Sequence, residues 1–378
     1  MVSSTSTNGV SKGCATKKLN RQVFASKTWT IELRKPHKVL GVEFAPINIP
    51  LERRKQTLAV LTWTALFFFS GPGGPVILVY TFFFTRLWPL SLLYAIWIVY
   101  DRNTCNVGSR KNGTITKFFK NWVLWKYYVR YFPIKLVKTA ELDPKRNYLL
   151  ASHPHGILAS GTFASFSTEA NKVSTVFPNI QFNMLTLPLN FYLPIYRELC
   201  LGHGLCSAKK ESMNYLLSHP DGGRGAVLVP GGAQESLESH PGKYVVQLKK
   251  RKGFVKVALQ NGSPLVPIYC FGENDIYDQV NNPDGSLLRG FQNKVMELFT
   301  FAPLFFTGRG IFQYNYGILP RRHPIFVVVG APIDVEKVES PTNDQIDSLH
   351  SKYMQALQNL FDKHKSEFAH SDAQLKII

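Results

Sequence analysis

One long apolar stretch limits what this chain can fold into. Between Leu58 and Tyr100 the sequence carries a single charge, Arg86, among leucine, valine, isoleucine, phenylalanine and tryptophan. One helical pass through a bilayer needs about 20 apolar residues, whereas a long soluble helix normally keeps a polar face. We therefore predict that residues 58–100 are embedded in a membrane.

Basic residues flank this apolar stretch on both sides. Arg53-Arg54-Lys55 precedes it, and Arg102, Arg110 and Lys111 follow it. Because positively charged residues collect on the cytosolic side of membranes, both ends are expected on that side. The stretch is therefore predicted to enter the membrane and return as a hairpin.

The turn of the hairpin has two candidate positions. Gly71-Pro72-Gly73-Gly74-Pro75 is the stronger helix breaker, but a turn there leaves a first arm too short to span, at about 1.5 Å per residue. Arg86-Leu87-Trp88-Pro89 is the alternative, and it shortens the second arm instead. Either position predicts a re-entrant or tilted hairpin with one shallow arm.

The chain of 378 residues has a formal net charge of +19. Such an excess favours anionic partners, namely nucleic acid, an acidic membrane surface or a phosphorylated ligand. The apolar hairpin argues against nucleic acid, so we expect none. Residues 1–57, rich in serine and threonine and then in basic residues, are predicted to form a flexible cytosolic arm attracted to anionic headgroups.

The cysteines lack the CxxC spacing of a metal site. The chain has five, at Cys14, Cys105, Cys200, Cys206 and Cys270. Neither a disulfide framework nor a zinc site is predicted, which fits a catalytic part that faces the reducing cytosol. We expect no bound metal and no permanently bound cofactor.

Residues 117–132 combine aromatic and basic side chains at helical spacing. The aromatic and aliphatic positions recur every three or four residues, at Phe118, Trp122, Trp125, Val129 and Phe132. Lysine and arginine interleave with them, which is typical of a helix lying in the membrane interface. The alternative is an amphipathic helix packed on the protein core.

From Tyr131 onward, strand-like and helix-like segments alternate. Short aliphatic runs predict strands at 148–151, 226–229, 265–269 and 325–329. Helices are predicted at 209–218, 252–260 and 344–364, the last capped near Ser340-Pro341. This order predicts an α/β class with a mixed, largely parallel sheet flanked by helices. We assign residues 101–378 to this domain and expect it to face the cytosol and to be catalytic.

The first of these strands ends in His153-Pro154-His155-Gly156. Pro154 favours extended geometry at the residue before it, and residues two apart on an extended chain project to one face. Both imidazoles are therefore predicted to point into one site. Imidazole has an unperturbed pKa close to neutral pH, which suits a general base that takes a proton from a hydroxyl. Gly156 leaves room for backbone or substrate to approach closely.

Two further kinds of segment could bind an anion. In Pro230-Gly231-Gly232, after the second strand, paired glycines free backbone N–H groups for an oxyanion or a phosphate. Basic side chains are grouped before a predicted helix and again between two glycines, at Lys249, Lys250, Arg251 and Lys252 and at Arg309. These five are candidates for holding the phosphates of a ligand.

Taken together and in order, the motifs of this chain resemble those of the diacylglycerol acyltransferase 2 family. The matching segments are Tyr131-Phe132-Pro133, His153-Pro154-His155-Gly156, Phe166-Ser167-Thr168-Glu169-Ala170, Pro230-Gly231-Gly232, Arg251-Lys252-Gly253-Phe254, Val266-Pro267-Ile268-Tyr269, Phe271-Gly272-Glu273-Asn274 and Gly308-Arg309-Gly310. Each piece is short, and the ordered set is what makes the resemblance specific. It spans roughly residues 51–368.

The resemblance implies a membrane-bound enzyme that transfers a fatty acyl group from acyl-CoA, as co-substrate, to diacylglycerol. The family also contains monoacylglycerol and wax alcohol acyltransferases, so a monoacylglycerol, wax alcohol or retinol acceptor remains the alternative. Members lie in the endoplasmic reticulum membrane and on lipid droplets with the catalytic part in the cytosol. Membrane lipids and the droplet surface are thus expected partners, and a homo-oligomer stays open.

The resemblance also suggests roles for individual residues. His153 is expected to be the base, with His155 as its rival or helper, and Gly156, Gly231 and Gly232 to provide backbone groups around the oxyanion. Distantly similar glycerolipid acyltransferases have an aspartate five residues after the histidine, a position that is not acidic here. Glu169 is therefore the candidate that orients the imidazole. A non-catalytic lipid-droplet or lipid-binding protein is the hypothesis from a different class.

Overall fold

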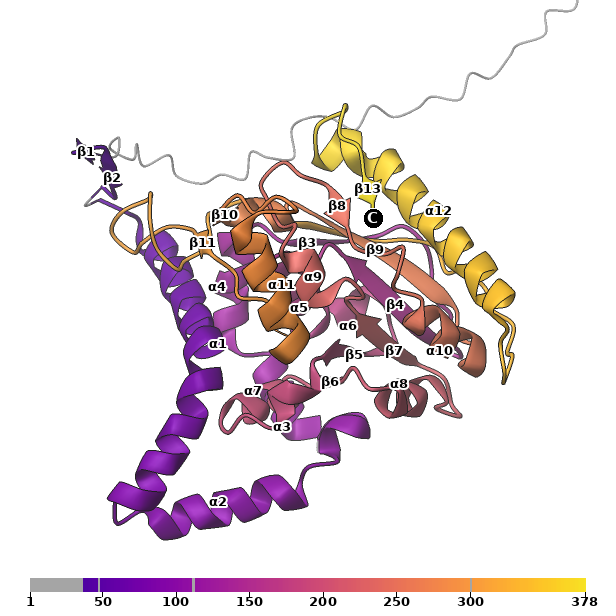
Figure 1. The fold of residues 1–378 in the computed structure, drawn as a ribbon, viewed down its shortest axis with the longest axis horizontal. Coiled ribbons are helices and arrows are strands. Elements are labelled where there is room, and N and C mark those ends of the chain that lie inside the picture. The colour runs from indigo at the N-terminus through magenta and orange to yellow at the C-terminus, as the bar shows by residue number, and fades with distance from the viewer. Residues whose placement is uncertain (1–36, 47, 111–112, 300) are drawn as a thin grey trace, which may run out of the picture.

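The computed structural model describes residues 37–46, 48–110, 113–299 and 301–378, so most of the predicted N-terminal arm lies outside the described residues. A seven-stranded sheet forms the centre of the described chain (Figure 1). Its strands, in spatial order, are β3 (Lys135–Lys138), β12 (Phe326–Val329), β9 (Leu265–Phe271), β4 (Asn147–His153), β7 (Arg224–Leu228), β5 (Gln181–Thr186) and β6 (Cys206–Ser207).

All neighbouring strands of this sheet are parallel except β12 and β9. The prediction of an α/β class with a mixed, largely parallel sheet is therefore confirmed. The register pairs Ala151 of β4 with Leu228 of β7, and His153 of β4 with Tyr269 of β9. The carboxyl ends of β4, β7 and β9 consequently meet at one edge, where sites form in sheets of this kind.

The predicted strands are buried on both faces, as expected for the central strands of a parallel sheet. Leu150, Val227 and Val266 belong to the core on one face of the sheet. Leu149 and Ala226 belong to the core on the other face. Because burying each large aliphatic side chain contributes about 1.5–3 kcal/mol, short runs of this composition are enough to place the strands.

Helices α8 (Lys210–Leu217), α10 (Gly253–Asn261) and α12 (Asn343–Phe368) lie close to their predicted ranges, and α12 runs along one side of the molecule (Figure 1). The buried stripe of α12 includes Tyr353 and Phe361. Its start differs from the prediction, because Thr342, rather than the preceding Ser-Pro pair, forms a capping box with Gln345.

The aromatic segment at 117–132 forms two helices, α3 (Gly113–Lys120) and α4 (Val123–Tyr131). Trp125, Tyr128 and Tyr131 are buried in the core rather than exposed on a lipid-facing side. The core-packed alternative therefore describes α4. Helical periodicity shows that one face is apolar, but it does not say whether lipid or protein covers that face.

The apolar stretch forms α1 (Leu51–Phe84) and α2 (Trp88–Tyr100), which turn at 85–87; the end of α1 and α2 project from the rest of the molecule (Figure 1). The turn is thus at the second candidate position. Most side chains of both helices are half-buried or exposed despite being apolar. Among the described helices, α1 is long and apolar enough to cross a membrane, which indicates membrane association.

The Gly-Pro-Gly-Gly-Pro segment lies inside α1, so its prediction as a turn would have been wrong. Gly74 explains its composition, because a Cβ there would lie 1.9 Å from the Pro194 carbonyl oxygen. The glycine thus lets α1 pack directly on the chain before α7. Tyr94 of α2 accepts a hydrogen bond from the Ile195 N–H at 2.9 Å, so the same segment holds both helices.

The remaining elements are short apart from α11. They are β1 (His37–Val39), β2 (Val42–Phe44), η1 (Thr104–Asn106), α5 (Ser160–Phe166), α6 (Val173–Val176), η2 (Pro188–Phe191), α7 (Tyr196–Gly202), α9 (Gly232–Ser236), β8 (Val245–Val246), η3 (Glu273–Ile276), β10 (Asp278–Gln279), α11 (Leu287–Phe299), β11 (Phe306–Thr307) and β13 (Lys376–Ile377). Three of them, α5, α9 and η3, begin just beyond the strand ends that form the site.

Candidate active site

His153 is the last residue of β4 and is fully buried, with 0% of its surface exposed. Its Nδ1 lies 3.6 Å from a carboxylate oxygen of Glu235, and its Nε2 lies 3.2 Å from the Tyr353 hydroxyl oxygen. The Tyr353 hydroxyl in turn donates to the Ala151 carbonyl oxygen at 3.0 Å. Both ring nitrogens of His153 therefore face protein groups. This fits a residue that supports the structure of the site.

His155 lies in a different environment from His153 and is half-buried. Its Nδ1 is 3.1 Å from the Gly156 carbonyl oxygen and 2.9 Å from the Ser236 hydroxyl oxygen. The Gly156 carbonyl oxygen only accepts hydrogen bonds, so its contact favours the tautomer with the imidazole hydrogen on Nδ1. Nε2 then carries the lone pair, which is the state that a general base requires.

Glu235, in α9, supports the loop that carries the two histidines. Its carboxylate is buried and accepts hydrogen bonds from the backbone N–H of His155 at 2.8 Å and of Gln247 at 3.0 Å. Gly231 makes room for this side chain, because a Cβ there would lie 2.3 Å from the Glu235 carboxyl carbon. The Pro-Gly-Gly turn thus brings a carboxylate to both histidines.

A second buried carboxylate, Glu273, supports the loop from the end of β9. It accepts hydrogen bonds from the backbone N–H groups of Ser160 at 2.7 Å and Gly161 at 2.8 Å, where α5 begins. Burial raises the pKa of Glu273 to about 7, although these two bonds act in the opposite direction. Gly156 has φ +62°, and a Cβ there would lie 2.6 Å from Glu273 Cγ. Gly156 is therefore required by the conformation and packing of the loop.

The glycines after β7 lie beside this loop. Gly232 has φ +55°, and nothing lies within 4 Å of the position of a Cβ on it. Its carbonyl oxygen accepts from the Ser236 hydroxyl at 3.4 Å, and that hydroxyl contacts His155. Across the described part of the chain, no residue accepts a hydrogen bond from the N–H of Gly231 or Gly232. Both N–H groups are thus unpaired in the described structure.

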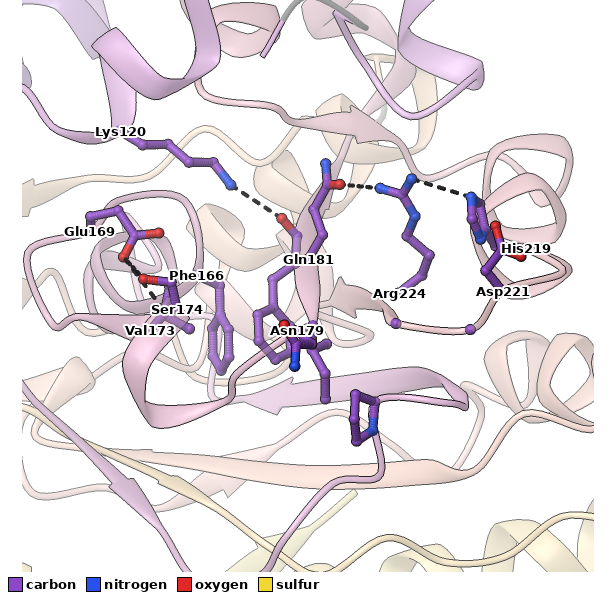
Figure 2. Close-up of a pocket in the computed structure, with 15 residues that line it drawn as sticks. Lys120, Phe166, Glu169, Val173, Ser174, Asn179, Gln181, His219, Asp221 and Arg224 are labelled. Atoms are coloured by element: carbon purple, nitrogen blue, oxygen red, sulfur yellow. Dashed lines mark hydrogen bonds between the residues drawn. The ribbon is translucent and has the colours of Figure 1, made fainter. Parts of the chain in front are cut away.

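Glu169 does not lie with the histidines, so the prediction that it orients the imidazole is wrong. Figure 2 shows its carboxylate turned toward Ser174, whose hydroxyl donates to it at 2.9 Å. It lines a pocket of about 640 Å³ together with Gln181 and Arg224, the first residues of β5 and β7. Because Gln181 and Arg224 begin their strands whereas His153 ends β4, Glu169 lies at the opposite edge of the sheet from His153.

Two residues that sequence reasoning did not assign, Glu235 and Ser236, complete the site. Both follow the Pro-Gly-Gly segment after the second predicted strand. The carboxyl-end rule for parallel sheets could have indicated them, since it directs attention to polar side chains beyond each strand.

The sequence matches the family model described as diacylglycerol acyltransferase over residues 80–378. The chain belongs to the diacylglycerol acyltransferase family. It is 44% identical over 329 residues to human 2-acylglycerol O-acyltransferase 1, covering 87% of this chain and 97% of that protein. It is 44% identical over 340 residues to diacylglycerol O-acyltransferase 2 of Dictyostelium discoideum, covering 89% and 99%.

Human diacylglycerol O-acyltransferase 2 is 45% identical over 319 residues, covering 84% of this chain and 81% of that protein. A more distant likeness, at 12% identity and a TM-score of 0.38, is to the crystal structure of the 1-acyl-sn-glycerophosphate acyltransferase PlsC from Thermotoga maritima, covering 82% of this chain and 97% of that one. The family predicted from the ordered motifs is confirmed by the family model and the curated relatives.

In this member of the diacylglycerol acyltransferase family, the basic residues before α10 lie near the histidine loop. Lys249, Lys250, Arg251 and Lys252 are exposed. The Arg251 guanidinium donates to the side-chain oxygen of Gln234 at 3.0 Å, directly beside Glu235. Lys252 pairs with Asp347 at 2.6 Å. The structure thus connects this group of cations with the candidate site.

Arg309 is placed differently, and the prediction that it holds phosphate is not supported by its surroundings. Its side chain is buried and donates to the carbonyl oxygens of Gly310 at 3.0 Å and Ile311 at 3.3 Å. Its guanidinium also lies 4.4 Å from the centre of the Tyr314 ring. The Arg309 guanidinium is thus engaged by contacts within its own loop.

None of the cysteine side chains that the structure describes forms a hydrogen bond with His153 or His155. Cys105, Cys200, Cys206 and Cys270 are free and buried. Burial raises the pKa of Cys200, Cys206 and Cys270 to about 12, so these thiols are not thiolates at neutral pH. Within the described ranges, no group of three or more histidine, cysteine, aspartate or glutamate side chains has the arrangement of a metal site.

Proposed function

We propose that this protein transfers a fatty acyl group from acyl-CoA to the free hydroxyl of diacylglycerol, forming triacylglycerol, with His155 as the general base. The observation that carries this proposal is the orientation of His155. The contact with the Gly156 carbonyl oxygen favours the hydrogen on Nδ1, which leaves Nε2 with its lone pair on a half-buried ring. His153, the base favoured from the sequence, is enclosed and is assigned a supporting role.

The reaction proceeds by direct transfer. The Nε2 of His155 takes the proton of the acceptor hydroxyl while the hydroxyl oxygen attacks the thioester carbonyl carbon. The tetrahedral intermediate then expels the sulfur of CoA, the new ester bond remains, and the proton on His155 passes to the thiolate. The N–H groups of Gly231 and Gly232 hold the negative oxygen of the intermediate, and losing one such donor typically lowers kcat by about 100-fold or more.

Acyl-CoA is bound through its phosphates by the exposed cations at Lys249, Lys250, Arg251 and Lys252. Arg251 is central because its contact with Gln234 links the cluster to the site. We expect Arg251→Ala to raise the KM for acyl-CoA with little change in kcat, since the lost contact lies outside the reacting groups. Lys256→Ala, an exposed cation on the next turn of α10, is the matched control. An unchanged KM in the Arg251 variant would remove it from the proposal.

The apolar helix pair and the family resemblance support the proposed location. The pair α1 and α2 would anchor the protein in the endoplasmic reticulum membrane and at the lipid-droplet surface, with the catalytic domain in the cytosol and the lipid acceptor delivered from the membrane. Monoacylglycerol is the second candidate acceptor, because a relative of similar identity is named a 2-acylglycerol O-acyltransferase.

Acceptor competition tests the proposed function. Full-length protein in lipid vesicles is supplied with labelled acyl-CoA and equal amounts of diacylglycerol, monoacylglycerol, retinol and fatty alcohol. We expect labelled triacylglycerol from diacylglycerol as the main product. Predominance of labelled diacylglycerol would favour the monoacylglycerol alternative. Absence of every labelled ester from a folded, membrane-bound protein would favour a lipid-binding protein without this activity.

A further inference from the structure

Helix α11 has its polar side toward the protein. Its buried polar side chains are Arg289 and Gln292. The Arg289 guanidinium binds the carboxylate of Glu238. Gln292 donates to the Pro303 carbonyl oxygen at 3.0 Å and accepts from the Asn282 amide at 2.9 Å. A helix at the surface of a soluble protein normally has the opposite arrangement, with apolar residues inward.

The outer side of α11 is correspondingly apolar. Leu287, Phe291 and Leu298 are 95%, 53% and 69% exposed, and their spacing of four and seven residues places them on one stripe. Lys294 is exposed on the same stripe. A lysine can lay its apolar stem along such a surface and keep its ammonium group in water or among headgroups. Apolar and basic residues in this order are typical of helices that lie in a membrane interface.

The apolar stripe continues toward the helix that could cross a membrane. After α11, Phe301 and Phe305 are also exposed. The next residue, Phe306, stacks on Phe68 of α1 with ring centres 5.6 Å apart. The segment that carries these exposed aromatic residues therefore reaches α1 through Phe306. A soluble protein seldom exposes so continuous an apolar surface.

We propose that α11 and residues 301–305 form a second membrane-contact surface, which lies at the headgroup boundary of the bilayer that holds α1. A lipid surface is the occupant because the stripe continues into α1 and carries Lys294, which would meet anionic headgroups. The contact of Arg289 with Glu238 ties this surface to the chain three residues beyond Glu235. On the proposed function, the site would therefore lie immediately next to the membrane that supplies the acceptor.

The test uses the full-length chain in vesicles of phosphatidylcholine and phosphatidylserine. A photoreactive benzoylphenylalanine replaces Phe291, and in a matched protein it replaces Gln355, an exposed position on α12. After irradiation, we expect several-fold more lipid adduct from position 291 than from position 355. Equal yields at the two positions, or adducts from 291 to a second copy of the chain, would overturn the proposal.

A combined variant separates the stripe from the hairpin. Leu287→Gln, Phe291→Gln and Leu298→Gln are made together, and the probe is placed at Phe301 or at the exposed Val76 of α1. We expect lipid adducts at 301 to fall several-fold while those at 76 stay constant. Unchanged adducts at 301 would contradict the proposal. Because adducts are counted without turnover, failure of the acyltransferase assay would leave this result intact, and the two proposals can fail separately.

Discussion

Glu235→Gln tests most directly whether the Glu235 carboxylate supports the site. The carboxylate accepts from the N–H of His155 at 2.8 Å and of Gln247 at 3.0 Å. A glutamine keeps the shape but offers one accepting oxygen, and its NH₂ group then faces one of the two N–H donors. The substitution therefore replaces one hydrogen bond to a charged acceptor with a contact between two donors.

The size of the effect follows from that exchange. A hydrogen bond to a charged group contributes about 1.5–3 kcal/mol, and each 1.4 kcal/mol corresponds to about tenfold in rate. If the loop that carries His155 bears the loss, kcat falls by about 10- to 100-fold. The loss of the bond also lowers the free energy of unfolding, by about 1–3 kcal/mol.

The assay compares Glu235→Gln with Glu169→Gln at saturating acyl-CoA and acceptor, and records thermal unfolding of each. Glu169 is the matched control, because it was the carboxylate favoured from the sequence and its partner in the structure is Ser174. We expect the Glu169 variant to retain wild-type kcat. The reasoning is refuted if Glu169→Gln loses activity and Glu235→Gln keeps it.

Two further predictions concern the stability of the fold. Because burial raises the pKa of Glu273 from 4.5 to about 7, the folded chain binds a proton that the unfolded chain has released between these values. The free energy of unfolding should therefore fall by about 3 kcal/mol as the pH rises from 4.5 to 7, and Glu273→Gln should flatten that slope in denaturant titrations at several pH values. Gly74→Ala should lower the unfolding temperature, because its Cβ would meet the Pro194 carbonyl, whereas Gly73→Ala, with nothing within 4 Å, should not. Equal unfolding temperatures for the two alanine variants would contradict the close packing of α1.

Much of the sheet could be predicted because its central strands are short, apolar and bounded by glycine or proline. The position of His153 and His155 at a strand end followed from the same pattern. The same rule points to the loop that contains Glu235, but the contact of this carboxylate with the histidine loop depends on β7 lying next to β4. Strand order is set by packing between segments far apart in the chain, and a single sequence does not display it.

Two features of the helices show a similar limit. Pro72 and Pro75 lie within α1, although proline in a helix normally breaks it at a cost of about 3 kcal/mol or more. Prolines are tolerated within membrane helices, where neighbouring groups can satisfy the freed backbone. The aromatic periodicity predicts an apolar face on α4, and the protein core covers that face.

The central claim is that His155 accepts the proton, and single-turnover acyl transfer by His155→Ala tests it directly. The full-length variant is compared with His370→Ala, an exposed histidine near the C-terminal end of α12. General-base catalysis contributes about 100- to 10,000-fold, so the account predicts a loss of that size in the His155 variant, with unchanged unfolding temperature and membrane binding. A folded His155→Ala protein that transfers the acyl group as fast as His370→Ala would contradict the claim.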